Sequence, residues 1–202
     1  YMISVLYPDN LAQPIQTTLT KLFHPASAMM LYMLGFFILL LSLGIDRWKS
    51  LVGAVAFGLS SYFLIILAAG HNSKAYAIGY LPIVIAGVLL VFRGKNIPGA
   101  LLFTLGLSLE ILAGHPQITY YLALIVLLFG LFQFIESIQK KELPNFIKAS
   151  VLLVIAAIFA IGANISGLWA TWEYGKYTIR GKTELTSEQE NRTSGLDIDY
   201  AT

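Results

Sequence analysis

The chain has 202 residues, of which 57% are hydrophobic and only 12% charged, whereas an ordinary soluble domain carries about 25% charged residues. The net charge of +2 without a basic stripe argues against a nucleic-acid partner, and the absence of cysteine excludes disulfides and thiolate chemistry. The apolar residues come in runs near the ~20 residues that cross a bilayer, so the composition indicates a membrane protein.

The elements follow one another in a simple order along the chain. Residues 1–24 contain no basic segment followed by an apolar one, so they do not resemble a signal peptide, and we expect a fragment of an outer loop. Residues 25–163 predict an all-α, polytopic membrane bundle of about six transmembrane helices. The six apolar runs cover residues 25–44, 51–69, 75–92, 97–113, 116–134 and 146–162. Residues 164–202 are expected to form an outer polar segment that is truncated.

The short connections predict how these helices are oriented. Basic residues near span ends mark the cytoplasmic side, and the first, third and fifth connections carry them. These residues are Arg47, Lys49, Arg93, Lys95, Lys140 and Lys141. The second and fourth connections, and both termini of the fragment, are therefore expected on the outer side.

A short pattern occurs in both outer turns. Ala69-Gly70-His71, followed by Tyr76, is repeated as Ala113-Gly114-His115, followed by Tyr120. A purely structural explanation accounts for the glycines, which can end a helix in the left-handed conformation. It does not require a histidine in each turn, so we favour a functional interpretation.

Glu110 is the one acidic residue deep inside an apolar run. An ionisable group there costs at least a few kcal/mol unless it faces protein, a partner or water, so such residues are functional candidates. The alternative is a carboxylate satisfied by neighbouring hydroxyls or by Lys74. We expect Glu110, His71 and His115 to be catalytic candidates in a wet outer cleft.

Further polar residues on the same predicted side are candidates for substrate binding. Lysine and arginine side chains suit a phosphate, and the amide side chains could line the same cleft. The candidates are Lys74, Asn72, Gln117, Tyr120, Lys176 and Arg180. Histidine and glutamate are possible zinc ligands, but their spacing matches no compact metal motif. We therefore predict no metal and no cofactor.

Several motifs in order resemble a known family. They are Ser60-Ser61-Tyr62, residues 69–74, Leu109-Glu110, residues 115–121, residues 173–177 and residues 194–202. Together they are similar to the YfhO family of bacterial multi-pass membrane proteins, in the version typical of Bacteroidetes and through essentially the whole chain.

This resemblance implies a relative of the C-type glycosyltransferases in the bacterial inner membrane. Such enzymes transfer a sugar from a polyprenyl-phosphate carrier, and the acceptor expected here is a cell-envelope polymer on the outer face. The partners implied are membrane lipid, the donor and the acceptor. Their acidic catalytic residue commonly lies in the first outer loop, where this chain offers only Asp9. We therefore expect the fragment alone to be inactive.

Two other functions fit the same sequence features. A transporter or lipid flippase could use Glu110 and His115 to relay protons or bind cargo, although its polar groups would lie near the membrane midplane. A non-catalytic scaffold subunit would tolerate substitution of these polar residues.

Overall fold

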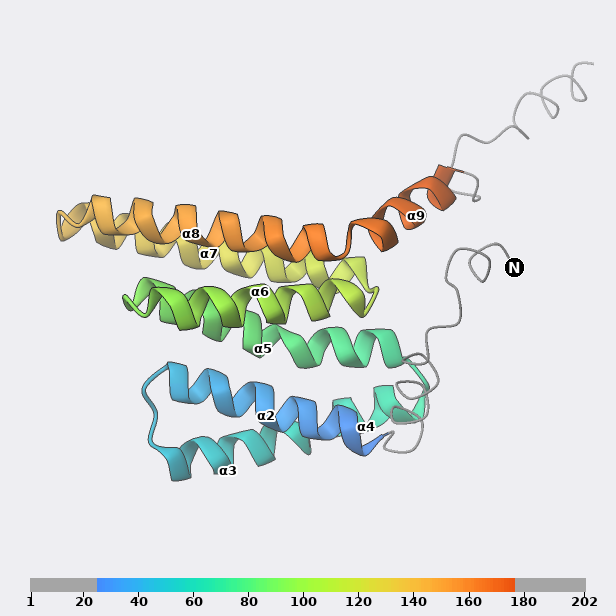
Figure 1. The fold of residues 1–202 in the computed structure, drawn as a ribbon. Coiled ribbons are helices and arrows are strands. Elements are labelled where there is room, and N and C mark those ends of the chain that lie inside the picture. The colour runs from blue at the N-terminus through green and yellow to red at the C-terminus, as the bar shows by residue number, and fades with distance from the viewer. Residues whose placement is uncertain (1–24, 177–202) are drawn as a thin grey trace, which may run out of the picture. The chain divides into compact units, whose positions relative to one another are not determined.

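Every regular element among the described residues is an α-helix, as the composition predicts. The structure is a computed structural model that describes residues 25–176. Its helices are α2 (Ala26–Ser42), α3 (Arg47–Gly58), α4 (Ser61–Ala68), α5 (Asn72–Phe92), α6 (Asn96–Leu112), α7 (Pro116–Gln139), α8 (Leu143–Ala163) and α9 (Ile165–Lys176) (Figure 1). The all-α fold class is confirmed.

Five of the six apolar runs form one helix each, but the second forms two. The prediction of a single helix over residues 51–69 is wrong, because α3 ends at Gly58 and α4 begins at Ser61, with a bend of 42° between them. Ser60 has an extended backbone, with φ −57° and ψ 135°, and is the N-cap of α4. The Ser60 side chain makes no cap hydrogen bond, and the apolar pattern gives no signal for this break.

Among the described residues, three helices, α5, α7 and α8, are long and apolar enough to cross a membrane, and the bent α3–α4 pair could count as a fourth span. The apolar helices α2 and α6 have 17 residues each. At ~1.5 Å per residue a helix of this length is about 26 Å long, at the lower end of what spans a bilayer. The fold is thus compatible with a helical membrane bundle, in which three to four spans meet the criteria of length and composition within residues 25–176 and α2 and α6 are shorter apolar helices.

Helix α5 lies at the centre of the bundle, between α2 and α6 (Figure 1). Its contact with α6 is close because glycines face the neighbouring backbone. A Cβ atom at Gly87 would lie 2.6 Å from the backbone nitrogen of Phe103, and one at Gly99 would lie 2.7 Å from that of Val91. Small residues at such interfaces let apolar helices pack closely without a hydrophobic driving force between them.

Two clusters of buried side chains fill the bundle, and α5 contributes to both. One cluster joins α5 to α6, α7 and α8, and includes Val84, Phe103 and Leu153. The other joins α2, α4 and the start of α5, and the rings of Tyr32 and Phe63 stack there with centroids 4.3 Å apart. Helix α5 therefore connects the two halves of the bundle.

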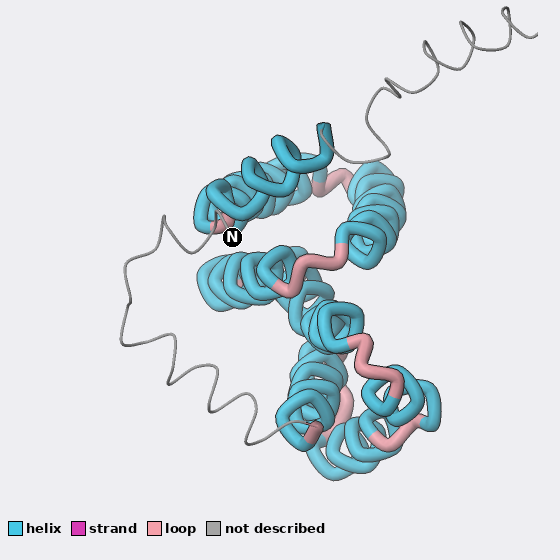
Figure 2. Tube along the Cα trace, turned by 90° about the vertical axis from the view of Figure 1, so that its right-hand side faces the viewer, coloured by secondary structure: helices cyan, strands magenta, loops and turns pink. Residues whose placement is uncertain are grey.

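The connections gather at two ends of the bundle, seen nearly end-on in Figure 2. The guanidinium of Arg93 donates hydrogen bonds to the carbonyls of Ser42 and Leu43, and residues 93–96 share a pocket with residues 140–148. We call the connections 43–46, 93–95 and 140–142 the basic end. The turns 69–71 and 113–115 form what we call the histidine end.

Helix α9 belongs to a second compact unit, residues 164–202, distinct from residues 1–163. Within α9 the rings of Trp169 and Trp172 have centroids 5.4 Å apart, and the hydroxyl of Thr171 donates to the carbonyl of Gly167 at 2.8 Å. Trp169 and Trp172 are both exposed.

Candidate functional site at the histidine end

The two Gly-His turns line one recess, which we call the histidine recess. It has a volume of about 470 Å³. Its walls are Gly70, His71, Asn72, Ser73, Lys74, Gly114 and His115. Four of the candidate site residues, namely His71, Asn72, Lys74 and His115, are thus brought together from two turns more than 40 residues apart in the chain.

Each turn is built in the same way. Gly70 and Gly114 have φ of +74° and +71°, in the left-handed region where a side chain is disfavoured. The following histidine is then the N-cap of the next helix, α5 or α7, and neither imidazole caps its helix by a hydrogen bond. Because the backbone alone makes both turns, the two imidazoles are not needed for capping.

The recess also contains a helix start and a cation. Helix α5 begins at Asn72, and the first N–H groups of an α-helix have no acceptor within the helix and attract anions. The ammonium of Lys74, in the first turn of α5, lies 5.5 Å from the ring centroid of Tyr62 in α4. This cation–π contact holds Lys74 over the ring of Tyr62. Lys74 therefore does not form the ion pair with Glu110 that the sequence left open as an alternative.

Glu110 is fully buried, with 0% of its surface exposed, and it does not line the histidine recess. It lies on the buried face of α6 together with Gly99, Phe103 and Gly106. These positions recur at intervals of three and four residues, which places them on one side of a helix. Glu110 therefore points into the protein and not into lipid.

A threonine links Glu110 to the histidine turn. The hydroxyl of Thr119 donates to Oε1 of Glu110 at 3.0 Å, and it lies 3.4 Å from the carbonyl oxygen of His115. Oε2 of Glu110 and Nδ1 of His115 are both buried without a hydrogen-bond partner among the described residues. A neighbouring hydroxyl thus satisfies half of the carboxylate, which is the structural alternative that the sequence left open.

The remaining candidate residues lie elsewhere. The amide of Gln117 donates to the hydroxyl of Tyr121 at 2.9 Å, and Tyr120 is 60% exposed; neither lines the recess. Lys176 is the last residue of α9, in the second unit, and Arg180 lies outside the described residues.

Sequence reasoning missed Thr119, Tyr62 and Ser73 as parts of this site. Thr119 lies one helical turn after His115, and this spacing puts both on one face of α7. That spacing was the only signal that could have identified it.

The lining favours an anionic ligand. It combines one ammonium, two imidazoles and the start of α5, all of which can donate to a phosphate. Within residues 25–176, histidine and carboxylate side chains do not gather in groups of three that could hold a metal ion. Comparisons with protein-family models, curated proteins and solved structures gave no match to this chain.

Proposed function

We propose that the protein is a membrane glycosyltransferase that binds a polyprenyl-phosphate sugar at the histidine end and transfers the sugar to a cell-envelope polymer. The observation that carries the proposal is the single recess shared by the two Gly-His turns. The resemblance to the YfhO family supplies the substrate class. The basic end then faces the cytoplasm and the histidine end faces outward, as the distribution of arginine and lysine favours.

In the transfer, the bond between the sugar C1 and the carrier phosphate breaks and a bond from C1 to an acceptor oxygen forms. The departing phosphate gains negative charge, and Lys74 with the start of α5 stabilises it. The acceptor hydroxyl loses its proton to a base. His71 and His115 line the recess and can reach a ligand, so they are the bases that this arrangement supports.

Glu110 has a different place in this mechanism. Because it is buried behind Thr119, it could accept the proton directly only if the turn 113–115 moved. In this arrangement Glu110 acts as a positioning residue, which holds the start of α7 through Thr119 and so orients His115.

A lipid flippase or transporter remains the second candidate, and one observation favours it. The break between α3 and α4, with its 42° bend, is typical of the discontinuous helices that bind substrates in transporters. The polar side chains of the histidine recess, however, lie at helix ends and not beside this break at Leu59 and Ser60.

The test is a transfer assay with the full-length protein in proteoliposomes that contain a polyprenyl-phosphate hexose with a radiolabelled sugar. We expect Lys74→Gln to lower transfer about tenfold or more, since a hydrogen bond to a charged group contributes ~1.5–3 kcal/mol. Lys49→Gln, at the basic end, is the matched control and should leave the rate unchanged. Movement of intact donor lipid across the bilayer without release of its sugar would instead establish the flippase.

A further inference from the structure

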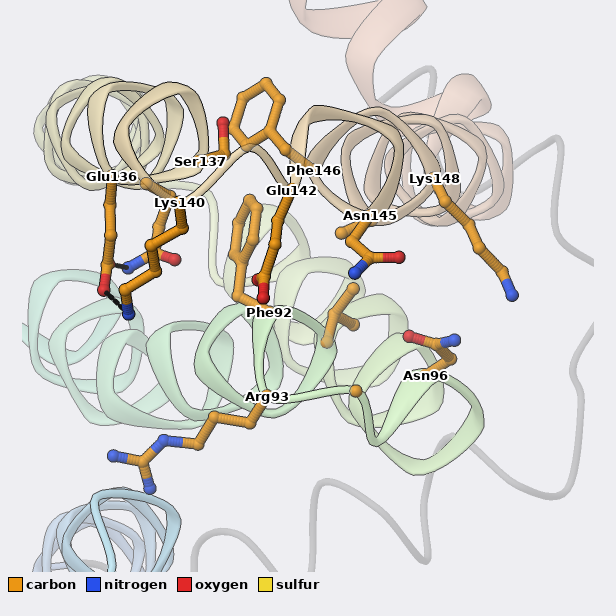
Figure 3. A pocket seen from close by; sticks show the side chains of 14 residues that line it. Phe92, Arg93, Asn96, Glu136, Ser137, Lys140, Glu142, Asn145, Phe146 and Lys148 are labelled. Atoms are coloured by element: carbon orange, nitrogen blue, oxygen red, sulfur yellow. Dashed lines mark hydrogen bonds and ion pairs between the residues drawn. The ribbon is translucent and has the colours of Figure 1, made fainter.

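A second polar pocket lies at the basic end, on the opposite side of the bundle from the histidine recess. We call it the basic-end pocket. It has a volume of about 630 Å³, within the ~300–1,000 Å³ range of small-molecule sites. The connection between α5 and α6 forms one wall, and the ends of α7 and α8 form the other (Figure 3).

Three cationic side chains line the basic-end pocket, and two of them already interact with other groups of the protein. The ammonium of Lys140 lies 2.5 Å from Oε1 of Glu136, and this hydrogen bond and the carboxylate charge raise the pKa of Lys140. The guanidinium of Arg93 donates to the carbonyls of Ser42 and Leu43, and in Figure 3 it points away from Glu142. Neither cation is the primary anchor for a ligand.

The side chains that remain are one cation, one anion and two amides. Lys148, Glu142, Asn96 and Asn145 line the pocket, and no side-chain hydrogen bond or ion pair within residues 25–176 holds any of the four. In Figure 3, Lys148 and Asn145 extend from α8 on the side of Asn96, while Glu142 lies between them and the Glu136–Lys140 pair. Lys148 and Glu142 therefore place opposite charges at two positions in one pocket.

The start of one helix adds to the positive side. Asn96 is the first residue of α6, whose N-cap Lys95 makes no side-chain cap. Helix N-termini favour phosphate groups. The phosphate side of a ligand would thus lie near Lys148 and Asn96, and a cationic group would lie near Glu142.

We propose that the basic-end pocket binds the headgroup of a phospholipid that carries both a phosphate and a primary ammonium, a phosphoethanolamine group. The pocket lies at the ends of apolar helices, at the depth where headgroups meet a bilayer. Pockets between helices that contain basic residues at this depth are common headgroup sites. Helices α7 and α8, which form its wall, expose apolar side chains such as Phe132, Ile138 and Ile147 that can contact acyl chains.

A comparison of three phospholipids with different headgroups distinguishes this proposal from simple charge attraction. Phosphatidylethanolamine has a phosphate and an ammonium that donates hydrogen bonds to Glu142. Phosphatidylcholine has a methylated ammonium that donates none, and phosphatidylglycerol has no ammonium. We expect the ethanolamine lipid to bind about tenfold more tightly than the other two, because hydrogen bonds between charged groups are the strong ones.

The experiment measures binding of these three lipids to the detergent-purified protein by native mass spectrometry. Glu142→Gln should abolish the preference for the ethanolamine lipid, and Lys148→Gln should weaken all three lipids. Lys49→Gln, a lysine at the same end that does not line the pocket, should change nothing.

Water-soluble phosphoethanolamine, added as a competitor, identifies the source of the ligand. Displacement of the lipid only at a large excess supports a lipid site, and displacement at equal concentration supports the same chemistry from a soluble compound. Equal binding of the three lipids to the unmodified protein would overturn the proposal, and so would a preference that survives Glu142→Gln. If a variant fails to fold, the comparison of headgroups on the unmodified protein decides alone.

Discussion

The hydrogen bond between Thr119 and Glu110 should contribute measurably to stability. Thr119→Val keeps the shape of the side chain but removes the donor to Oε1, which lies 3.0 Å away. Oε2 of Glu110 already has no partner within the described residues, so the variant leaves both oxygens of a fully buried carboxyl group unpaired. An unsatisfied buried polar group costs ~1–3 kcal/mol. At ~2–4 °C per kcal/mol for a domain of this size, the melting temperature should fall by about 2–12 °C.

Thermal unfolding in detergent, followed by circular dichroism, measures this change. Thr119→Ser keeps the hydroxyl and is the matched control, with an expected shift smaller than that of Thr119→Val. The double variant Glu110→Met, Thr119→Val removes both polar partners and should recover most of the lost stability. An unchanged melting temperature in Thr119→Val, or a double variant less stable than either single one, would refute this account of how Glu110 is held.

The other stability predictions concern the glycines. Gly87→Ala places a Cβ atom 2.6 Å from the backbone nitrogen of Phe103, and the overpacking should cost ~1–3 kcal/mol, whereas Gly130→Ala, with open space around it, should not lower the melting temperature. Equal effects of the two would contradict the close contact of α5 and α6. Gly114→Ala forces a side chain into the left-handed region and should cost ~1–2 kcal/mol. Its melting temperature should fall below that of the unmodified protein, and a stable variant would show that the turn can take another conformation.

The helices could be predicted from the sequence because each is an uninterrupted apolar run closed by glycine, proline or charged residues. The left-handed turns predicted at Gly70 and Gly114 are confirmed. They could be predicted because few residues other than glycine end a helix in this conformation. The break at Ser60 could not be predicted, because the run is apolar on both sides of it and the Ser60 side chain makes no cap hydrogen bond.

The juxtaposition of the two histidine turns follows from topology. Connections that alternate between the ends of antiparallel helices place residues 69–71 and 113–115 at the same end, and both line one recess. The direction in which the Glu110 side chain points could not be predicted from the apolar periodicity alone. Gly99 and Gly106 lie on the face of α6 that packs closely against α5, and Glu110 lies on the same face four residues after Gly106. A search for small residues along α6 would have indicated that Glu110 is buried against protein.

The central claim is that His71 and His115 act on one ligand in one recess, and a double-mutant cycle tests it most directly. The affinity for polyprenyl monophosphate is measured for the full-length protein, for His71→Ala, for His115→Ala and for the double variant. Two side chains that contact the same phosphate should show a coupling energy of ~0.5–3 kcal/mol. Losses that add to within ~0.3–0.5 kcal/mol, as expected for independent sites, or an affinity that neither substitution changes, would contradict the claim.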